Sequence, residues 1–234
     1  MNTKILIAED DRDISEIIEI YLIGEGYDLK TVRNGIEGLN AVNEENFDLA
    51  ILDIMMPEMD GYKLTREIRK ISNMPIIILS AKNEDQDKIL GLNIGADDYI
   101  TKPFNPLELI ARVNSHLRRN RKYNDSDKHV SKILSLKNLR LDTETCRLYK
   151  DDTELLITAT EYKMMSLFMK NPDKIFSKIQ LAEHILGEYF ESDSHTIRVH
   201  ISNLRHKLGV DKNGNQYIQT MKGLGYRIEN EKQI

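Results

Sequence analysis

Hydrophobic positions in the first half of the chain alternate between short apolar runs and helical spacing. The runs are rich in Ile, Leu and Val and are bounded by polar residues, which is typical of strands. They cover residues 4–8, 28–32, 49–52, 76–79 and 98–101. Between the first two runs, apolar side chains recur every three or four residues from Ile14 to Leu22, as in an amphipathic helix. Five strands alternating with helices predict an α/β domain with a parallel sheet covered on both faces.

The pattern changes after a polar, charged stretch near residue 120. Residues 121–131 have no apolar periodicity and are interpreted as a linker between domains 1–120 and 132–234. Short, closely spaced strand patterns follow, as in an antiparallel sheet. Next come three helical patterns, and two strand-like runs around Gly223 and Gly225 predict a closing hairpin. This order predicts an α+β winged helix-turn-helix domain.

Charge divides the chain in the same place. The net charge is −5 over 234 residues, but residues 1–118 carry 13 Lys and Arg against 22 Asp and Glu, whereas residues 119–234 carry 20 against 16. A basic second half indicates a polyanionic partner. No apolar run approaches the roughly 18 residues of a membrane span, so we expect no membrane association. The single Cys146 is interpreted as structural and fits a reducing, cytoplasmic location.

A lone carboxylate, Asp53, interrupts the apolar third strand in the sequence LDIMMPEMDG. The first strand ends at Glu9 and Asp10, and with strand order 2-1-3-4-5 these three acids would converge. Such a cluster requires a cation, and oxygen ligands with room for water suit Mg²⁺. Ser80 and Lys102 end the fourth and fifth strands, which brings a hydroxyl and an ammonium to the same edge. These groups suit phosphoryl transfer to Asp53.

The alternative for each residue taken alone is a helix cap or an ordinary surface lysine. Residues placed at the ends of four different strands argue against that alternative. The motifs ILIAEDD, LDIMMPEMDG, LSA and GADDYITKPF resemble the receiver domains of bacterial two-component response regulators, which have a flavodoxin-like (βα)5 fold. The resemblance implies the following roles: phospho-acceptor Asp53; Mg²⁺ ligands Asp10, Asp53 and the Met55 carbonyl, with Glu9 acting through water; switch pair Ser80 and Tyr99; phosphate contact Lys102.

The same resemblance implies a phosphorylation-dependent homodimer through the fourth and fifth helices. The expected interface has an apolar patch between charged residues that pair across a two-fold axis. The patch is Leu92 and Ala111, and the expected cross-subunit pairs are Lys88–Glu108, Asp97–Arg112 and Asp98–Arg119.

The last helical pattern has an apolar stripe and a polar face. Ile197, Ile201, Leu204 and Leu208 recur at helical spacing and are predicted to face the core. A small apolar residue among polar ones on the opposite side suits the DNA major groove, although an ordinary surface helix has a similar composition.

Residues 132–234 resemble the winged-helix effector of OmpR/PhoB-type regulators, in which TIRVHISNLRHKL matches the recognition helix and YIQTMKGLGYRI the wing. The resemblance implies the following DNA contacts: Thr196, Val199, His200, Asn203 and Arg205, with Lys222 in the minor groove. Arg198 stands where an acidic residue is common and would add a phosphate contact. The segment HILGEYFESDS lacks a tryptophan often found before its glycine, which weakens the case for an RNA polymerase contact there.

The sequence therefore predicts a transcription regulator that a sensor histidine kinase phosphorylates and that binds double-stranded promoter DNA as a dimer. We expect no enzymatic activity beyond phosphorylation of its own Asp53. One alternative is a Mg²⁺-dependent phosphohydrolase with an aspartyl-phosphate intermediate, but Met55 stands where such an enzyme needs a second acid. Another is a receiver with an RNA-binding output, yet residues 190–234 hold only three aromatic residues for base stacking.

Overall fold

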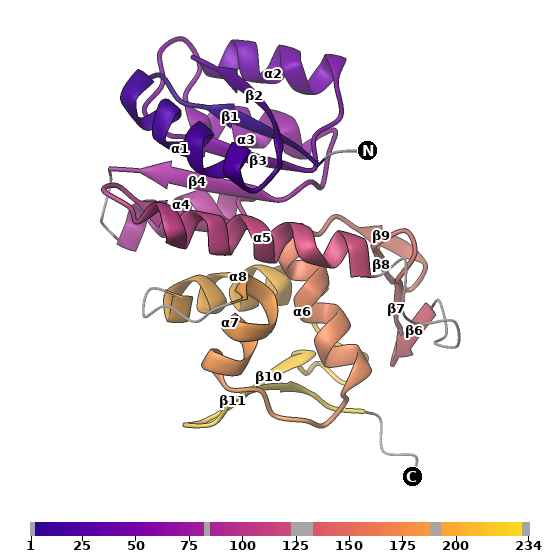
Figure 1. The fold of residues 1–234 in the computed structure, drawn as a ribbon. Coiled ribbons are helices and arrows are strands. Elements are labelled where there is room, and N and C mark those ends of the chain that lie inside the picture. The colour runs from indigo at the N-terminus through magenta and orange to yellow at the C-terminus, as the bar shows by residue number, and fades with distance from the viewer. Residues whose placement is uncertain (1–2, 82–84, 123–132, 188–192, 231–234) are drawn as a thin grey trace. The chain divides into compact units, whose positions relative to one another are not determined.

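Two compact units make up the chain, residues 1–121 and residues 122–234. The computed structural model shown in Figure 1 describes residues 3–81, 85–122, 133–187 and 193–230. Most of the predicted linker, 121–131, lies outside the described residues. The helix that precedes it continues to Lys122, slightly beyond the end expected from the apolar pattern.

The first unit alternates strands with helices, as its hydrophobic pattern predicts (Figure 1). Its elements are β1 (Lys4–Ala8), α1 (Arg12–Gly24), β2 (Asp28–Val32), α2 (Gly35–Glu44), β3 (Leu49–Asp53), α3 (Gly61–Arg69), β4 (Ile76–Ser80), α4 (Asp85–Ile94), β5 (Asp98–Thr101) and α5 (Pro106–Lys122). All strand pairs are parallel, in the order β2-β1-β3-β4-β5. The predicted doubly wound fold is therefore confirmed.

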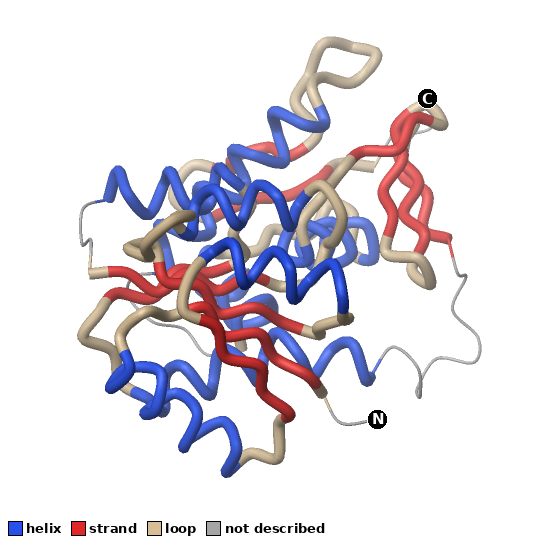
Figure 2. The backbone as a smooth tube through the Cα atoms, turned by 90° about the horizontal axis from the view of Figure 1, so that it is seen from above, coloured by secondary structure: helices blue, strands red, loops and turns tan. Residues whose placement is uncertain are grey.

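Helices lie on both sides of this sheet (Figure 2). Leu22 of α1 and Val113 of α5 are buried in one cluster with Ile51 of β3. Elsewhere α2 and α3 approach so closely that a Cβ atom on Gly38 would lie 2.9 Å from Leu64 Cδ2. Because both faces are covered, β3 and β4 are buried along their whole length. A polar residue at the end of either strand must therefore find its partners at the edge of the sheet.

The second unit begins with a sheet, continues with helices and ends in a hairpin. Its elements are β6 (Ile133–Leu136), β7 (Leu139–Asp142), β8 (Arg147–Lys150), β9 (Thr153–Leu155), α6 (Ala159–Lys170), α7 (Lys178–Leu186), α8 (Asp193–Leu208), β10 (Ile218–Met221) and β11 (Gly225–Ile228). The first four strands form an antiparallel sheet in chain order. This arrangement confirms the predicted α+β class. None of the helices in the described ranges is long and apolar enough to cross a membrane.

Local sequence sets the starts of two helices in this unit. Thr158 and Glu161 form a reciprocal capping box at the start of α6, and Ser177 and Gln180 form another at the start of α7. Each box satisfies backbone N–H groups that the first helical turn leaves without partners. The helices then bury their apolar sides in one core that extends to the sheet and the hairpin.

The closing hairpin is anchored at its base to the chain just before α7. Phe176 and Tyr226 exchange two backbone hydrogen bonds, each of 2.9 Å between N and O. Gly225 has a φ of +142°, and a Cβ atom there would lie 2.0 Å from the Phe176 carbonyl oxygen. Only glycine permits this approach, so the base of the hairpin is fixed against the helical core.

Candidate acidic site and nucleic-acid interface

Three carboxylates meet at the carboxyl edge of the first sheet. Glu9 and Asp10 follow β1, and Asp53 ends β3, which pairs directly with β1. One oxygen atom from each residue lies within 4.8 Å of the others. Glu9 and Asp53 are 1% and 3% exposed, whereas Asp10 is exposed to solvent. The predicted strand order thus brings these three acids together as expected.

Lys102 supplies the positive charge inside this cluster. Its Nζ atom lies 2.7 Å from Glu9 Oε2 and 2.9 Å from Asp53 Oδ1. Burial alone would lower the pKa of Lys102, but its hydrogen bonds to Glu9 and Asp53 raise that pKa. Burial raises the pKa of Glu9, and the hydrogen bond from Lys102 only partly offsets this effect. One ammonium therefore faces three acids and leaves the cluster with surplus negative charge.

The donor set fits a magnesium ion. All three side chains offer hard carboxylate oxygens, and the exposure of Asp10 leaves one side open to solvent for water ligands. Met55 follows in the β3–α3 loop, where its backbone N–H donates to Asp53 Oδ2 at 2.9 Å. That hydrogen bond holds the second oxygen of Asp53, while Lys102 holds the first.

The turn after Asp53 explains the rest of its motif. The backbone N–H of Gly61 donates to the Ile54 carbonyl at 3.1 Å, and a Cβ atom on Gly61 would lie 2.1 Å from the Asp53 carbonyl oxygen. Glu58, between them, has a φ of +64° and accepts a hydrogen bond from Asn34 Nδ2. The loop therefore folds back on the acid, and α3 starts against the backbone of Asp53 itself.

Ser80 ends β4, and Tyr99 is the second residue of the neighbouring strand β5. Both are buried, and their side chains are hydrogen-bonded. Burial raises the pKa of Tyr99. A Cβ atom on Gly91 of α4 would lie 3.3 Å from Tyr99 Cδ2, so the absence of a side chain there makes room for the ring. The ring of Tyr99 therefore already points inward in this structure.

In the second unit, α8 presents the expected two faces. Ile197, Ile201, Leu204 and Leu208 are buried in the core, which confirms the predicted apolar stripe. The residues expected to contact DNA differ in exposure. Arg198 is exposed and Asn203 is half-buried, whereas Thr196, Val199 and His200 are buried.

Two basic residues of α8 have partners inside the unit. Arg205 donates from Nε to the Ile218 carbonyl at 2.9 Å and from Nη2 to Thr220 Oγ1 at 2.7 Å, so it ties α8 to β10. Lys207 Nζ lies 2.5 Å from Glu161 Oε2 in α6. Lys222 is exposed in the β10–β11 turn, at the tip of the hairpin, where the sequence predicted it. The hairpin tip therefore has a fixed position relative to α8.

Comparison with known proteins relates both units to described families. Residues 5–114 match the family model "Response regulator receiver domain", and residues 152–228 match "Transcriptional regulatory protein, C terminal". Over 230 residues the chain is 39% identical to the regulatory protein VanR of Enterococcus faecium, covering 98% of this chain and 100% of VanR. The chain belongs to the OmpR/PhoB-type two-component response regulators.

Two further similarities extend over the whole response regulator. The transcriptional regulatory protein SrrA of Staphylococcus aureus is 34% identical over 232 residues, covering 98% of this chain and 96% of SrrA. The crystal structure of the response regulator DrrB, described as a Thermotoga maritima OmpR/PhoB homolog, has a TM-score of 0.53 at 26% identity and covers 98% of this chain and all of DrrB. The family is one of transcription regulators, which confirms that the chain is not a conventional enzyme.

The expected dimer face of this response regulator contains ion pairs within the chain. Asp97 is buried and pairs with Arg69 of α3, with Nη2 and Oδ2 2.6 Å apart. Asp98 pairs with Arg112 at 2.9 Å, and Arg112 also pairs with Glu108 at 2.8 Å. The structure thus differs from the expected cross-subunit pairing of Asp97 and Asp98, because each already has a cationic partner.

The other residues of that face have simpler surroundings. Lys88 and Ala111 are half-buried, and Leu92 is buried. The side chain of Arg119 lies outside the described residues. Burial of Asp98 raises its pKa, but Arg112 and His116, whose Nε2 atom lies 3.7 Å from Asp98 Oδ2, together outweigh this effect and hold the pKa well below its usual range. The Asp98–Arg112 pair therefore keeps its charges in the folded receiver.

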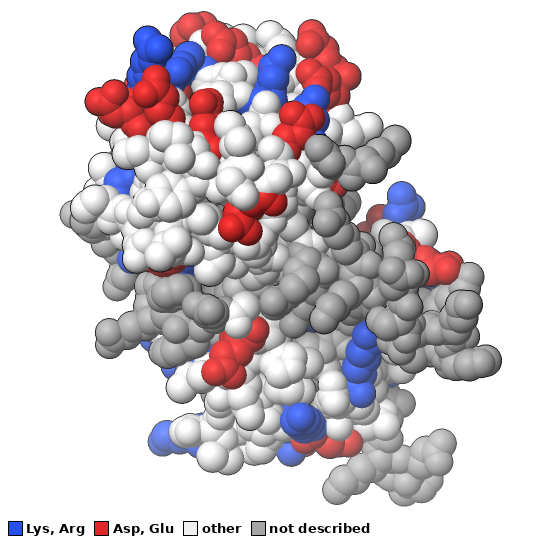
Figure 3. Space-filling view, viewed as in Figure 1, with Lys and Arg blue, Asp and Glu red and all other residues white. Residues whose placement is uncertain are grey.

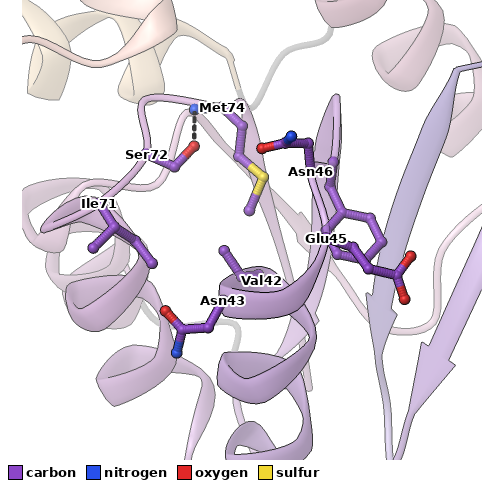
Figure 4. Close-up of a pocket in the computed structure, with 8 residues that line it drawn as sticks. Val42, Asn43, Glu45, Asn46, Ile71, Ser72 and Met74 are labelled. Atoms are coloured by element: carbon purple, nitrogen blue, oxygen red, sulfur yellow. Dashed lines mark hydrogen bonds between the residues drawn. The ribbon is translucent and has the colours of Figure 1, made fainter.

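A pocket of about 280 Å³ lies at the opposite edge of the receiver sheet (Figure 4). It is lined by the end of α2 and by the loops that lead into β3 and β4: Val42, Asn43, Glu45, Asn46, Phe47, Ile71, Ser72 and Met74. The acids lie at the carboxyl ends of the strands, whereas this pocket lies at their amino ends. It is therefore separate from the acidic site.

Charged side chains on the visible face follow the sequence asymmetry only in part. Acidic residues gather over the top of the receiver in Figure 3, with several Lys and Arg among them. Over the effector, scattered Lys and Arg are seen together with acidic residues.

The site on the receiver also includes contacts that the sequence did not single out, namely those of Arg33, Asn34 and Tyr62. Arg33 Nη1 donates to Ser15 Oγ at 2.9 Å and to the Glu9 carbonyl at 3.3 Å.

Proposed function

We propose that Asp53 accepts a phosphoryl group from a sensor histidine kinase and that the phosphorylated protein binds double-stranded promoter DNA as a dimer in the cytoplasm. The position of Asp53 carries this proposal. Asp53 ends an otherwise apolar strand beside Glu9 and Asp10, and the ammonium of Lys102 contacts both Asp53 and Glu9. Such a site holds a negatively charged group only if cations compensate it, and both Lys102 and a magnesium ion would do so.

The chemistry follows from the positions of these groups. An Asp53 carboxylate oxygen attacks the phosphorus atom of a phosphohistidine and forms an acyl phosphate. The P–N bond breaks, its electron pair stays on the imidazole, and a proton from water neutralises that ring. Glu9 and Asp10, with Asp53 and the Met55 carbonyl, would hold Mg²⁺, which supplies positive charge to the phosphoryl oxygens. Lys102 already lies 2.9 Å from the acceptor oxygen and would contact the phosphoryl group.

Exposed polar and basic side chains of the effector support DNA as its binding partner. Arg198 and Ser202 are exposed on α8, Asn203 is half-buried, and Lys222 is exposed at the hairpin tip. We propose that α8 enters the major groove, where Asn203 reads one base edge and Arg198 contacts phosphate. Thr196, Val199 and His200, the other predicted DNA contacts of α8, are buried in this structure, so the proposal rests on Arg198 and Asn203. The hairpin tip would place Lys222 in the adjacent minor groove.

Two effectors on one dimer would bind half-sites about one helical turn apart. We propose the α4–β5–α5 face for this dimer. Lys88 and Glu108 are the pair proposed to exchange across the axis: the buried Asp97 is held by Arg69, whereas Glu108 shares Arg112 with Asp98 and keeps part of its side chain exposed. Lys88→Glu should then block phosphorylation-dependent dimerisation in sedimentation, and Glu108→Lys added to it should partly restore it. If phosphorylated Lys88→Glu protein dimerises like the wild type, Lys88 has no part in the interface.

The central experiment labels the full chain with acetyl phosphate and Mg²⁺. Intact mass should show one added phosphoryl group, and Asp53→Asn should remove it. The labelled wild type should select genomic duplex fragments more strongly than the unlabelled protein. A phosphoryl group on the Asp53→Asn protein would refute the acceptor, and selection of RNA rather than duplex DNA would refute the output. The segment expected to contact RNA polymerase includes residues 188–192, which lie outside the described residues.

A further inference from the structure

Tyr62 lies directly after the phospho-acceptor loop, the segment from Asp53 to Gly61 that joins β3 to α3. It is the second residue of α3, directly after the glycine whose backbone touches that of Asp53. Its predecessor Gly61 is also hydrogen-bonded to the Ile54 carbonyl. A displacement of the Asp53 loop must therefore move the first turn of α3 and with it the Tyr62 ring.

The other end of the Tyr62 side chain reaches two more elements. Its hydroxyl donates to the Asp87 carbonyl of α4 at 3.2 Å. Tyr62 is also hydrogen-bonded to Tyr99 of β5, which in turn is hydrogen-bonded to Ser80. The ring itself is half-buried. One side chain thus connects the acceptor loop, α4 and the inward-pointing Tyr99.

The position of Tyr99 depends on close packing as well as on these hydrogen bonds. Gly91 leaves room for the ring, and a Cβ atom there would lie 3.3 and 3.4 Å from two of its carbon atoms and 3.1 Å from Ile78 Cδ1. If the Tyr99 ring turned outward, its hydroxyl would leave both Ser80 and Tyr62. The hydrogen bond between the two tyrosines therefore exists only in the inward arrangement.

We propose that Tyr62 is a positioning residue of the phosphorylation switch: it holds Tyr99 inward and links it to the Asp53 loop and to α4. This inference rests on the proposed function. The switch pair Ser80 and Tyr99 is taken to be inward in the phosphorylated receiver. Tyr62 then raises the share of unphosphorylated receivers that already have this inward arrangement. A group that interacts with only one of two states shifts their ratio by its differential stabilisation. One neutral hydrogen bond corresponds to roughly a 2- to 10-fold change in that ratio.

The test compares full-length wild type with Tyr62→Phe, which keeps the ring and removes the hydroxyl. The probe is a genomic duplex fragment selected by the phosphorylated wild type, with affinity measured by fluorescence anisotropy before and after labelling with acetyl phosphate. Tyr62→Phe should weaken binding of the unphosphorylated protein by roughly 2- to 10-fold. It should change binding of the phosphorylated protein by less than twofold, because nearly all phosphorylated receivers are already in the inward arrangement. Tyr21→Phe, an exposed tyrosine of α1, is the matched control and should change neither affinity.

A second variant separates positioning from general damage. In a Tyr99→Phe background the Tyr62–Tyr99 hydrogen bond is already gone, so Tyr62→Phe should have a smaller effect than in the wild type. Equal loss in both phosphorylation states, or an undiminished effect in the Tyr99→Phe background, would overturn the role of Tyr62. So would unchanged affinity of the Tyr62→Phe protein while the wild type responds to phosphorylation. A wild type whose DNA affinity ignores phosphorylation would overturn the proposed function and this inference with it.

Discussion

Lys102 Nζ lies 2.9 Å from Asp53 Oδ1, and the same nitrogen lies 2.7 Å from Glu9 Oε2. One ammonium thus joins two buried acids that end neighbouring strands. Lys102 contacts Asp53 directly, so its ammonium would lie next to a phosphoryl group attached to Asp53. The arrangement also makes Lys102 a structural element of the site before any phosphorylation.

Lys102→Ala should therefore destabilise the receiver when no metal is present. The change leaves Glu9 and Asp53 buried without their cation, and the loss of one partner from a buried ion pair costs about 3–5 kcal/mol. Addition of Mg²⁺ should recover part of this loss, because the metal replaces the missing positive charge. Chemical denaturation with and without Mg²⁺ measures both effects. Lys63→Ala, which removes an exposed i,i+3 partner of Asp60, should change the free energy of unfolding by less than about 0.5 kcal/mol in either condition.

Mg²⁺ affinity should fall as the pH is lowered through the raised pKa of Glu9. The metal binds the ionised carboxylate, so binding below that pKa must release a proton. Without metal the sign for stability is opposite: a raised folded-state pKa contributes stability at low pH, and this contribution is lost as the pH rises through that pKa. Calorimetric titration of Mg²⁺ at several pH values tests the first statement. The Glu9→Gln protein should bind Mg²⁺ more weakly and without this pH dependence, and chelation with EDTA should stop labelling of Asp53 by acetyl phosphate.

Asp98→Asn should lower the free energy of unfolding by about 3 kcal/mol at neutral pH, because it removes one of the two carboxylates that pair with the buried Arg112 charge. The pKa of Asp98 is lowered in the folded state, so its contribution is complete above the ordinary aspartate value of about 3.9 and is lost as the pH falls below it. Asp98 stays ionised between pH 5 and 8, so its contribution to the difference in free energy of unfolding between variant and wild type should be constant over this range. Asp28→Asn, an exposed residue of β2, is the control. Because His116 contacts Asp98 and histidine ordinarily changes charge in this range, both proteins are compared in a His116→Gln background. A difference that shrinks between pH 8 and pH 5 there would show that Asp98 titrates and is not held ionised by Arg112.

The effector variants should separate affinity from sequence preference. Lys222→Ala should weaken binding to all duplexes and reduce the slope of log K against log salt by about one unit, as for loss of one phosphate contact. Asn203→Ala should instead relax the preference at one base pair, at a cost of roughly 1–3 kcal/mol for the selected sequence. Anisotropy titrations on selected and random duplexes at several salt concentrations measure both. Equal losses on both duplexes for both variants would refute the assignment of α8 as the reading helix.

The sequence predicted most of the receiver because its signals are local. The buried strands β1, β3 and β4 are almost unbroken apolar runs, and Asp53, Ser80 and Lys102 could be placed at one edge once the strands were parallel. Ion pairs between distant elements left no such signal. Asp97 meets Arg69 only because the start of β5 lies beside the end of α3. Tyr62 was not singled out because one tyrosine in an amphipathic helix predicts burial, not a bond to another hydroxyl.

In the effector, periodicity identified the apolar stripe of α8 but not the direction of each polar side chain. Arg205 was expected at DNA, yet its guanidinium donates to β10. A basic residue at the edge of a helix stripe can turn toward solvent or toward a neighbouring strand, and only the packed hairpin decides between them. The buried state of Thr196 and Val199 likewise depends on tertiary surroundings that the helical pattern does not encode.

The contacts of Arg205 with the Ile218 carbonyl and Thr220 Oγ1 set a limit on the DNA that this protein accepts. The hairpin base is also held in place at Gly225, so the distance between α8 and the hairpin tip is fixed. The bases read by α8 and the minor groove met by Lys222 must then be a set number of base pairs apart. A single inserted base pair between them would rotate the minor groove away from the tip by about 35°, since ten base pairs make one turn. Target half-sites should accordingly vary in sequence more readily than in length.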